Sequence, residues 1–75
     1  MIFEATAKSG KREALAKFND ETGVATVFLK APGTWIKIGE GIWNGTAIAG
    51  FQAILPENLL PLLLTELQKK IGTRG

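Results

Sequence analysis

The chain has 75 residues, with nine Lys and Arg against seven Asp and Glu, a formal net charge of +2, and neither Cys nor His. A chain of this length forms one domain, residues 1–75. Without Cys and His it has no disulfide, no thiolate metal site and no imidazole base. We therefore expect a protein that is not an enzyme and has no cofactor. A domain this small buries only about 60% of its unfolded surface, so we expect oligomerisation to support it.

The N-terminal part of the chain contains one segment that tolerates a strand and one segment with an ambiguous pattern. Residues 2–7 are short and tolerate a strand, whereas residues 12–18 have helical propensity together with an alternating apolar face. We interpret residues 12–18 as a strand that pairs with residues 2–7. Residues 19–23 are rich in turn formers and predict the next turn.

The middle of the chain predicts a hairpin with two different faces. Residues 24–30 alternate as a strand, residues 31–33 form a tight turn, and residues 34–38 form the next strand. The apolar face of this hairpin, which we expect in the core, contains Ala25, Val27, Leu29, Ile36 and Ile38. The opposite face carries aromatic and basic residues, namely Phe28, Lys30, Trp35 and Lys37.

A glycine-rich stretch follows this hairpin. Gly39 and Gly41 indicate a bend or bulge, and Asn44-Gly45 is a strong hairpin turn signal before a last strand over residues 46–55. Trp43 lies at this turn, where burial is difficult, so we expect it to contact a ligand, and we expect its neighbour Ile42 in the core.

The period then changes to that of a helix. We expect Asn58 to cap a helix that ends at Gly72, with Pro61 in its first turn. Its apolar surface is wider than one small sheet covers, which predicts a symmetric homodimer, the alternative being that the N-terminal segment covers the helix. The predicted dimer contacts are Leu59, Leu62, Leu63 and Leu67.

The aromatic and basic face suits single-stranded nucleic acid, because bases stack on aromatic rings while lysines neutralise phosphates. The predicted stacking residues are Trp35 and Trp43, with Phe28 as a third platform. The predicted phosphate contacts are Lys30, Lys37 and Lys17, with Lys11 and Arg12 at the periphery. For each aromatic residue the alternative is a packing role, and for each lysine a solvated surface charge.

The order of these elements resembles the single-stranded-DNA-binding domain of the transcriptional coactivator positive cofactor four, in its bacterial or phage form. Residues 35–43, WIKIGEGIW, resemble that family's second strand, which ends in a tryptophan that stacks on DNA. Residues 52–59, QAILPENL, resemble its last strand and the start of its helix. The loop after Trp43 is shorter and less basic than the family's, Glu40 stands near an expected basic residue, and residues 1–23 match poorly.

The resemblance implies a homodimer with paired helices that binds single-stranded DNA, including melted duplex, and acts in transcription, replication or recombination. From the residues we expect an α+β fold: a curved antiparallel sheet of four to five strands followed by one C-terminal helix. The alternatives are a purely protein-binding dimer and an RNA-binding module. Without a signal sequence or a membrane span, we expect a cytoplasmic protein, or a nuclear one if eukaryotic, with transcription or replication proteins as further partners.

Overall fold

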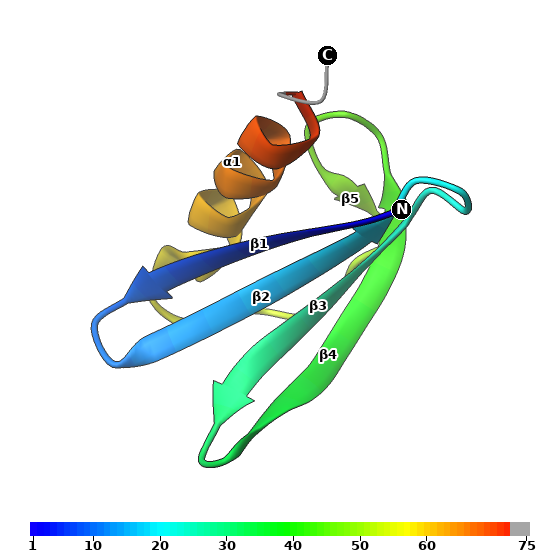
Figure 1. Ribbon diagram of the computed structural model, residues 1–75. Helices are drawn as coiled ribbons and strands as arrows, with labels where there is room; N and C mark the ends of the chain where they lie inside the picture. The colour runs from blue at the N-terminus through cyan, green and yellow to red at the C-terminus, as the bar shows by residue number, and fades with distance from the viewer. Residues whose placement is uncertain (73–75) are drawn as a thin grey trace.

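The computed structural model describes residues 1–72 as a five-stranded antiparallel sheet followed by one helix, which confirms the predicted α+β class (Figure 1). The strands follow one another across the sheet in the order β1-β2-β3-β4-β5. Their bounds are β1 Ile2–Ser9, β2 Arg12–Asn19, β3 Val24–Ala31, β4 Thr34–Trp43 and β5 Ile48–Ala49. A 3-10 turn at Pro56–Asn58 leads into the helix α1, Leu59–Gly72.

The ambiguous segment at residues 12–18 is strand β2. It pairs with β1 along its whole length, from Ile2 opposite Asn19 to Ser9 opposite Arg12. Its alternating apolar residues explain this outcome, because Ala14 and Ala16 are fully buried and Phe18 is nearly so. Burial on one face of a sheet therefore outweighs the helical propensity of the segment.

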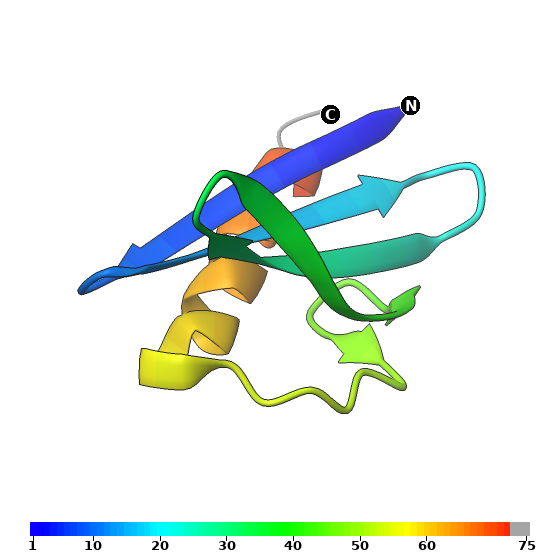
Figure 2. The same cartoon turned by 90° about the horizontal axis from the view of Figure 1, so that it is seen from below.

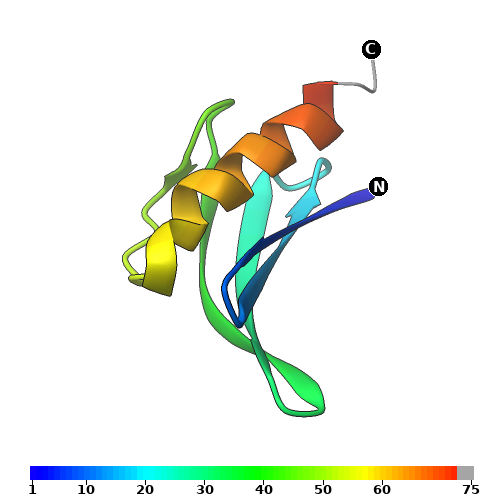
Figure 3. The same cartoon turned by 90° about the vertical axis from the view of Figure 1, so that its left-hand side faces the viewer.

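The helix α1 packs on one face of the sheet, mainly against β1 and β2 (Figure 3). Leu59, Leu63 and Leu67 recur every four residues along the helix, form one stripe and are fully buried in the core of the chain. The hairpin of β1 and β2 therefore covers the apolar stripe of the helix, which was the predicted alternative to a homodimer.

This packing corrects the predicted dimer contacts. Leu59, Leu63 and Leu67 cannot contact a second subunit without leaving the core, whereas Leu62 is 46% exposed on the helix surface. The homodimer stays a prediction, and in this fold Leu62 is the one of the four predicted contacts that remains accessible.

The predicted start of the helix is confirmed. The helix begins at Leu59, so Pro61 lies in its first turn, where a missing N–H costs no hydrogen bond. Asn58 directly precedes the helix, but its backbone is left-handed, with φ of 58°, instead of the extended conformation typical of an N-cap, so Asn58 does not have the geometry predicted for it as the helix cap. Lys69 and Lys70 lie in the last turn, where positive charge complements the helix dipole.

A β-bulge in β4 determines which side chains share a face. Val27 pairs with Gly39, but the next residue of β3, Phe28, pairs with Lys37, so Ile38 is an extra residue in β4. The alternation of β4 therefore inverts at this point. Trp35 and Lys37, before the bulge, point away from the helix, whereas Trp43, after it, points to the helix side.

Two core predictions fail because of this geometry. Ile42 is 52% exposed, since the bulge turns it to the face opposite the helix. Ile36 is 53% exposed, although it lies on the helix side, because the β3–β4 hairpin projects beyond the helix (Figure 3). Ile38, in contrast, packs against the core as predicted.

The predicted last strand at residues 46–55 is much shorter in the structure. The strand β5 has two residues, Ile48 and Ala49, and Gly50 then turns the chain with φ of 85°. Glycines in β4 make room for this segment. A Cβ on Gly41 would collide with the carbonyl oxygen of Ala49, and a Cβ on Gly39 would lie 2.7 Å from the Phe51 ring.

Candidate nucleic-acid interface

The sheet has an open face, on the side opposite the helix. Figure 2 and Figure 3 show α1 on one side of the sheet, and over residues 1–72 no other element covers strands β1 to β4 on the far side. The register places side chains of this open face in rows across the strands, such as Thr6, Leu15, Phe28 and Lys37. An uncovered sheet surface of this kind can receive an extended chain.

Four of the predicted site residues meet on the open face, near the tip of the β3–β4 hairpin. Phe28 pairs with Lys37 across the two strands, and Lys30 pairs with Trp35. The Nζ atom of Lys30 lies 4.8 Å from the centre of the Trp35 ring, which is within the range of a cation–π contact. We call Phe28, Lys30, Trp35 and Lys37 the aromatic–lysine cluster.

Lys17 extends the cluster toward the middle of the sheet. It lies on β2, and its Nζ atom is 5.5 Å from the centre of the Phe28 ring. The structure does not bring the two peripheral residues into the cluster. Lys11 lies in the β1–β2 turn, and Arg12 follows the alternation of Ala14 and Ala16, which is that of the helix side.

Trp43 lies on the other side of the sheet from the aromatic–lysine cluster. Its ring centre is 6.5 Å from that of Phe18, which is 6.1 Å from that of Phe3, and Trp43 packs half-buried against the core. Trp35 and Trp43 are an even number of residues apart, so a regular strand would place them on one face. The bulge separates them, and Trp43 is therefore not part of the open face.

Acidic residues reduce the positive charge of the open face. Lys37 Nζ forms a salt bridge of 2.9 Å with Oε1 of Glu40, which lies on the same face beyond the bulge. The register also places Glu4 opposite Lys17, and Glu13 opposite Lys8. The cluster is therefore a local concentration of cations and rings on a face of mixed charge.

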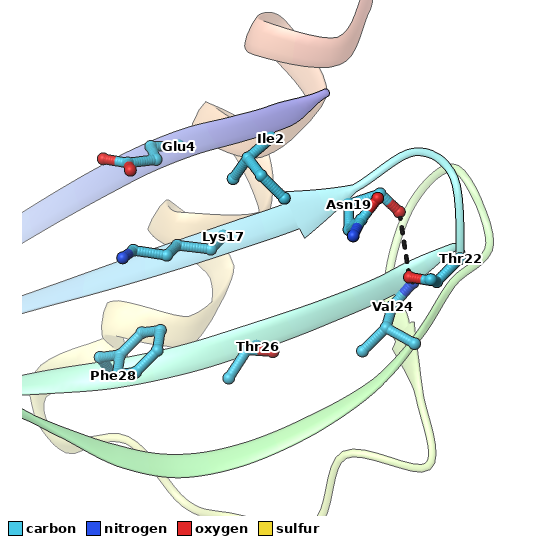
Figure 4. Close-up of a pocket in the computed structure, with 8 residues that line it drawn as sticks. All are labelled: Ile2, Glu4, Lys17, Asn19, Thr22, Val24, Thr26 and Phe28. Carbon is cyan, nitrogen blue, oxygen red and sulfur yellow. Dashed lines mark hydrogen bonds between the residues drawn. The ribbon is translucent and has the colours of Figure 1, made fainter.

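A shallow hollow adjoins the cluster, and sequence reasoning missed it. It has a volume of about 440 Å³ and lies over strands β1, β2 and β3 on the open face (Figure 4). Its lining residues are Ile2, Glu4, Lys17, Asn19, Thr22, Val24, Thr26 and Phe28. The strand register would have indicated this group, since it places Glu4, Lys17 and Thr26 in one row beside Phe28.

Comparisons with known proteins add no relative. No family model matches the chain, and no curated protein or solved structure is significantly similar to it. Within residues 1–72, no helix combines the length and the apolar character needed to cross a membrane. The geometry of the open face is therefore the observation that bears on function.

Proposed function

We propose that the chain binds single-stranded DNA on the open face of its sheet, with Trp35 and Phe28 as stacking platforms. The observation that carries the proposal is the aromatic–lysine cluster, in which Phe28 pairs with Lys37 and Lys30 with Trp35 on a face that no other described element covers. Bases of any kind stack on such rings, so binding at the cluster tolerates most sequences.

The lysines supply the electrostatic part of the binding. Lys30 and Lys17 each hold an ammonium group near a ring, at 4.8 Å and 5.5 Å from the ring centres. A base that stacks on the ring displaces the ammonium group from the ring face, and the displaced lysine then lies within reach of the phosphates that flank the base. Lys37 contributes less, because Glu40 competes with phosphate for it at 2.9 Å.

The mixed charge of the face predicts moderate affinity. Each phosphate that a lysine neutralises contributes a slope of about −0.7 to the dependence of log K on log salt for a single strand. With two lysines available and a third in a salt bridge, we expect a total slope between about −1 and −2. Binding should therefore be clear at low salt and weak at physiological salt.

The test is a fluorescence anisotropy titration of a labelled single strand of about 20 nucleotides at several salt concentrations. The variant Lys30→Gln should weaken binding and make the salt slope shallower by about 0.7. The matched control is Lys69→Gln, which removes the same charge from the last turn of α1, on the other side of the sheet. Equal effects of the two variants would mean that DNA senses only the net charge, and would refute binding at the cluster.

A second candidate function rests on the apolar end of the open face. Ile2 and Ile42 are 53% and 52% exposed, and both lie in the row of Val24. Exposed apolar side chains on a sheet suit a peptide or protein partner. Such a partner would bind with little dependence on salt, whereas a DNA strand would be released as salt rises.

A further inference from the structure

The hollow beside Phe28 carries an inference that rests on the proposed DNA binding and makes it more specific. Its volume of about 440 Å³ falls within the range of pockets that hold small organic ligands, and is sufficient for one nucleobase. Figure 4 shows Glu4, Lys17 and Phe28 following one another across β1, β2 and β3 at one end of the hollow, with Ile2 and Val24 toward the other end. A base stacked on Phe28 would thus present its edge to charged groups.

Glu4 and Lys17 are direct partners across β1 and β2, yet their side chains form no salt bridge with each other. In the part of the chain that the structure describes, no salt bridge includes Glu4, and Lys17 directs its Nζ atom over the Phe28 ring instead. The hollow therefore has a carboxylate with two free acceptor oxygens beside an ammonium donor. Since Lys17 lies between Phe28 and Glu4 in Figure 4, the donor of Lys17 and then the two acceptor oxygens of Glu4 follow one another away from the ring.

Guanine is the base that complements this order. Its Watson–Crick edge has one acceptor, O6, followed by two donors, the N1–H and the N2 amino group. The ammonium of Lys17 can donate to O6, while the two oxygens of Glu4 accept from N1–H and N2–H, a pairing of the two-point kind that discriminates between bases. Adenine, cytosine and thymine each lack this sequence of one acceptor and two donors.

We propose that the hollow formed by Glu4, Lys17 and Phe28 is a subsite that prefers guanine within an otherwise sequence-tolerant DNA surface. Phe28 stacks on the base, Lys17 leaves the ring to bind O6, and Glu4 reads the two donors. The carboxylate of Glu4 also repels phosphate, which favours a base over the backbone at this position.

The test uses oligonucleotides of about 11 residues, either thymidine throughout or with one central dG or dI, that compete for the labelled strand. Inosine keeps O6 and N1–H but lacks the N2 amino group, so it removes one of the two donors that Glu4 accepts. We expect the protein to bind the dG strand about five- to tenfold more tightly than the dI or all-thymidine strands. This comparison needs no variant of the protein.

The variant Glu4→Gln completes the test, because an amide offers one acceptor where the carboxylate offers two. The Glu4→Gln variant should bind the dG and dI strands about equally, while its affinity for the all-thymidine strand should not decrease. The control Glu66→Gln removes a carboxylate from α1, on the other side of the sheet, and should keep the preference. Equal binding of all strands by the unmodified protein would overturn the guanine subsite alone, whereas no binding of any strand would overturn the proposed function as well.

Discussion

The two tryptophans should respond differently to truncation, because the bulge in β4 places them on opposite faces of the sheet. Trp35→Ala removes a stacking platform on the open face. Stacking contributes about 1–3 kcal/mol per base, so the dissociation constant for a single strand should rise by about 5- to 150-fold. Trp35 is also partly buried, so its truncation loses apolar contact together with the contact to Lys30, and we expect a stability cost of about 1 kcal/mol, or about 4–8 °C in melting temperature.

Trp43→Ala should instead destabilise the fold. A fully buried Trp costs about 3–5 kcal/mol on truncation, and for the half-buried Trp43, packed 6.5 Å from Phe18, we expect about 2 kcal/mol. In a domain of this size that lowers the melting temperature by about 8–16 °C. Binding of DNA, measured below both melting temperatures, should be unchanged.

The assay pairs thermal denaturation, followed by circular dichroism, with the anisotropy titration, on both variants and the unmodified protein. A Trp43→Ala variant that melts normally but binds DNA weakly would refute the reasoning, because it would place the ligand on the helix side of the sheet. If the Trp35→Ala variant bound DNA as tightly as the unmodified protein, that result would refute the role of Trp35 as a stacking platform.

Four other substitutions test the packing and the charges. Leu63→Asp places a charge in the core and should lower the free energy of unfolding, measured by urea denaturation, by more than about 4 kcal/mol. Leu62→Asp should fold normally, and if the helices pair in a dimer this variant should sediment as a monomer. Equal stabilities of the two variants would contradict the burial of Leu63 and the exposure of Leu62. Gly41→Ala forces a Cβ against the backbone of β5 and should cost about 1–3 kcal/mol, and a normal melting curve would contradict that contact. Glu40→Gln releases Lys37 and should strengthen DNA binding up to about fivefold at low salt, while weaker binding would exclude Lys37 as a phosphate contact.

Local patterns predicted most of the secondary structure. The alternation of residues 24–30 marks β3, and Ala14, Ala16 and Phe18 mark β2 despite helical propensity, because a sheet needs one apolar face. Pro61 places the helix start, since Pro is tolerated in a first turn and disruptive in a helix interior. These signals are local to each segment and need no knowledge of what packs against it.

The side of the sheet on which each residue of β4 lies could not be predicted in the same way. Gly39 and Gly41 signalled a bulge, but not that Ile38 would be the extra residue, and this choice decides the faces of Ile42 and Trp43. It depends on how the segment after β5 packs, because Phe51 and Ala49 occupy the space that side chains at Gly39 and Gly41 would fill. Similarly, the width of the apolar helix surface did not reveal whether the cover was a second subunit or the N-terminal hairpin.

The candidate site was predicted in part for the same reason. Phe28, Lys30, Trp35 and Lys37 lie before the bulge, so simple alternation groups them correctly. The salt bridge of Lys37 with Glu40 and the hollow over β1 to β3 depend on residues that only the register across the sheet brings together.

The most direct test of DNA binding on the open face uses the variant Trp43→Phe, which leaves Trp35 as the only tryptophan of the chain. Its emission is titrated with an unlabelled thymidine strand of about 12 nucleotides at low and high salt, with a duplex of the same length as the control. Stacking on Trp35 should quench the emission with the single strand at low salt, less at high salt, and little with the duplex. No quenching by the single strand, at concentrations well above those that saturate binding in the anisotropy titration, would contradict the assignment of Trp35 as the stacking platform.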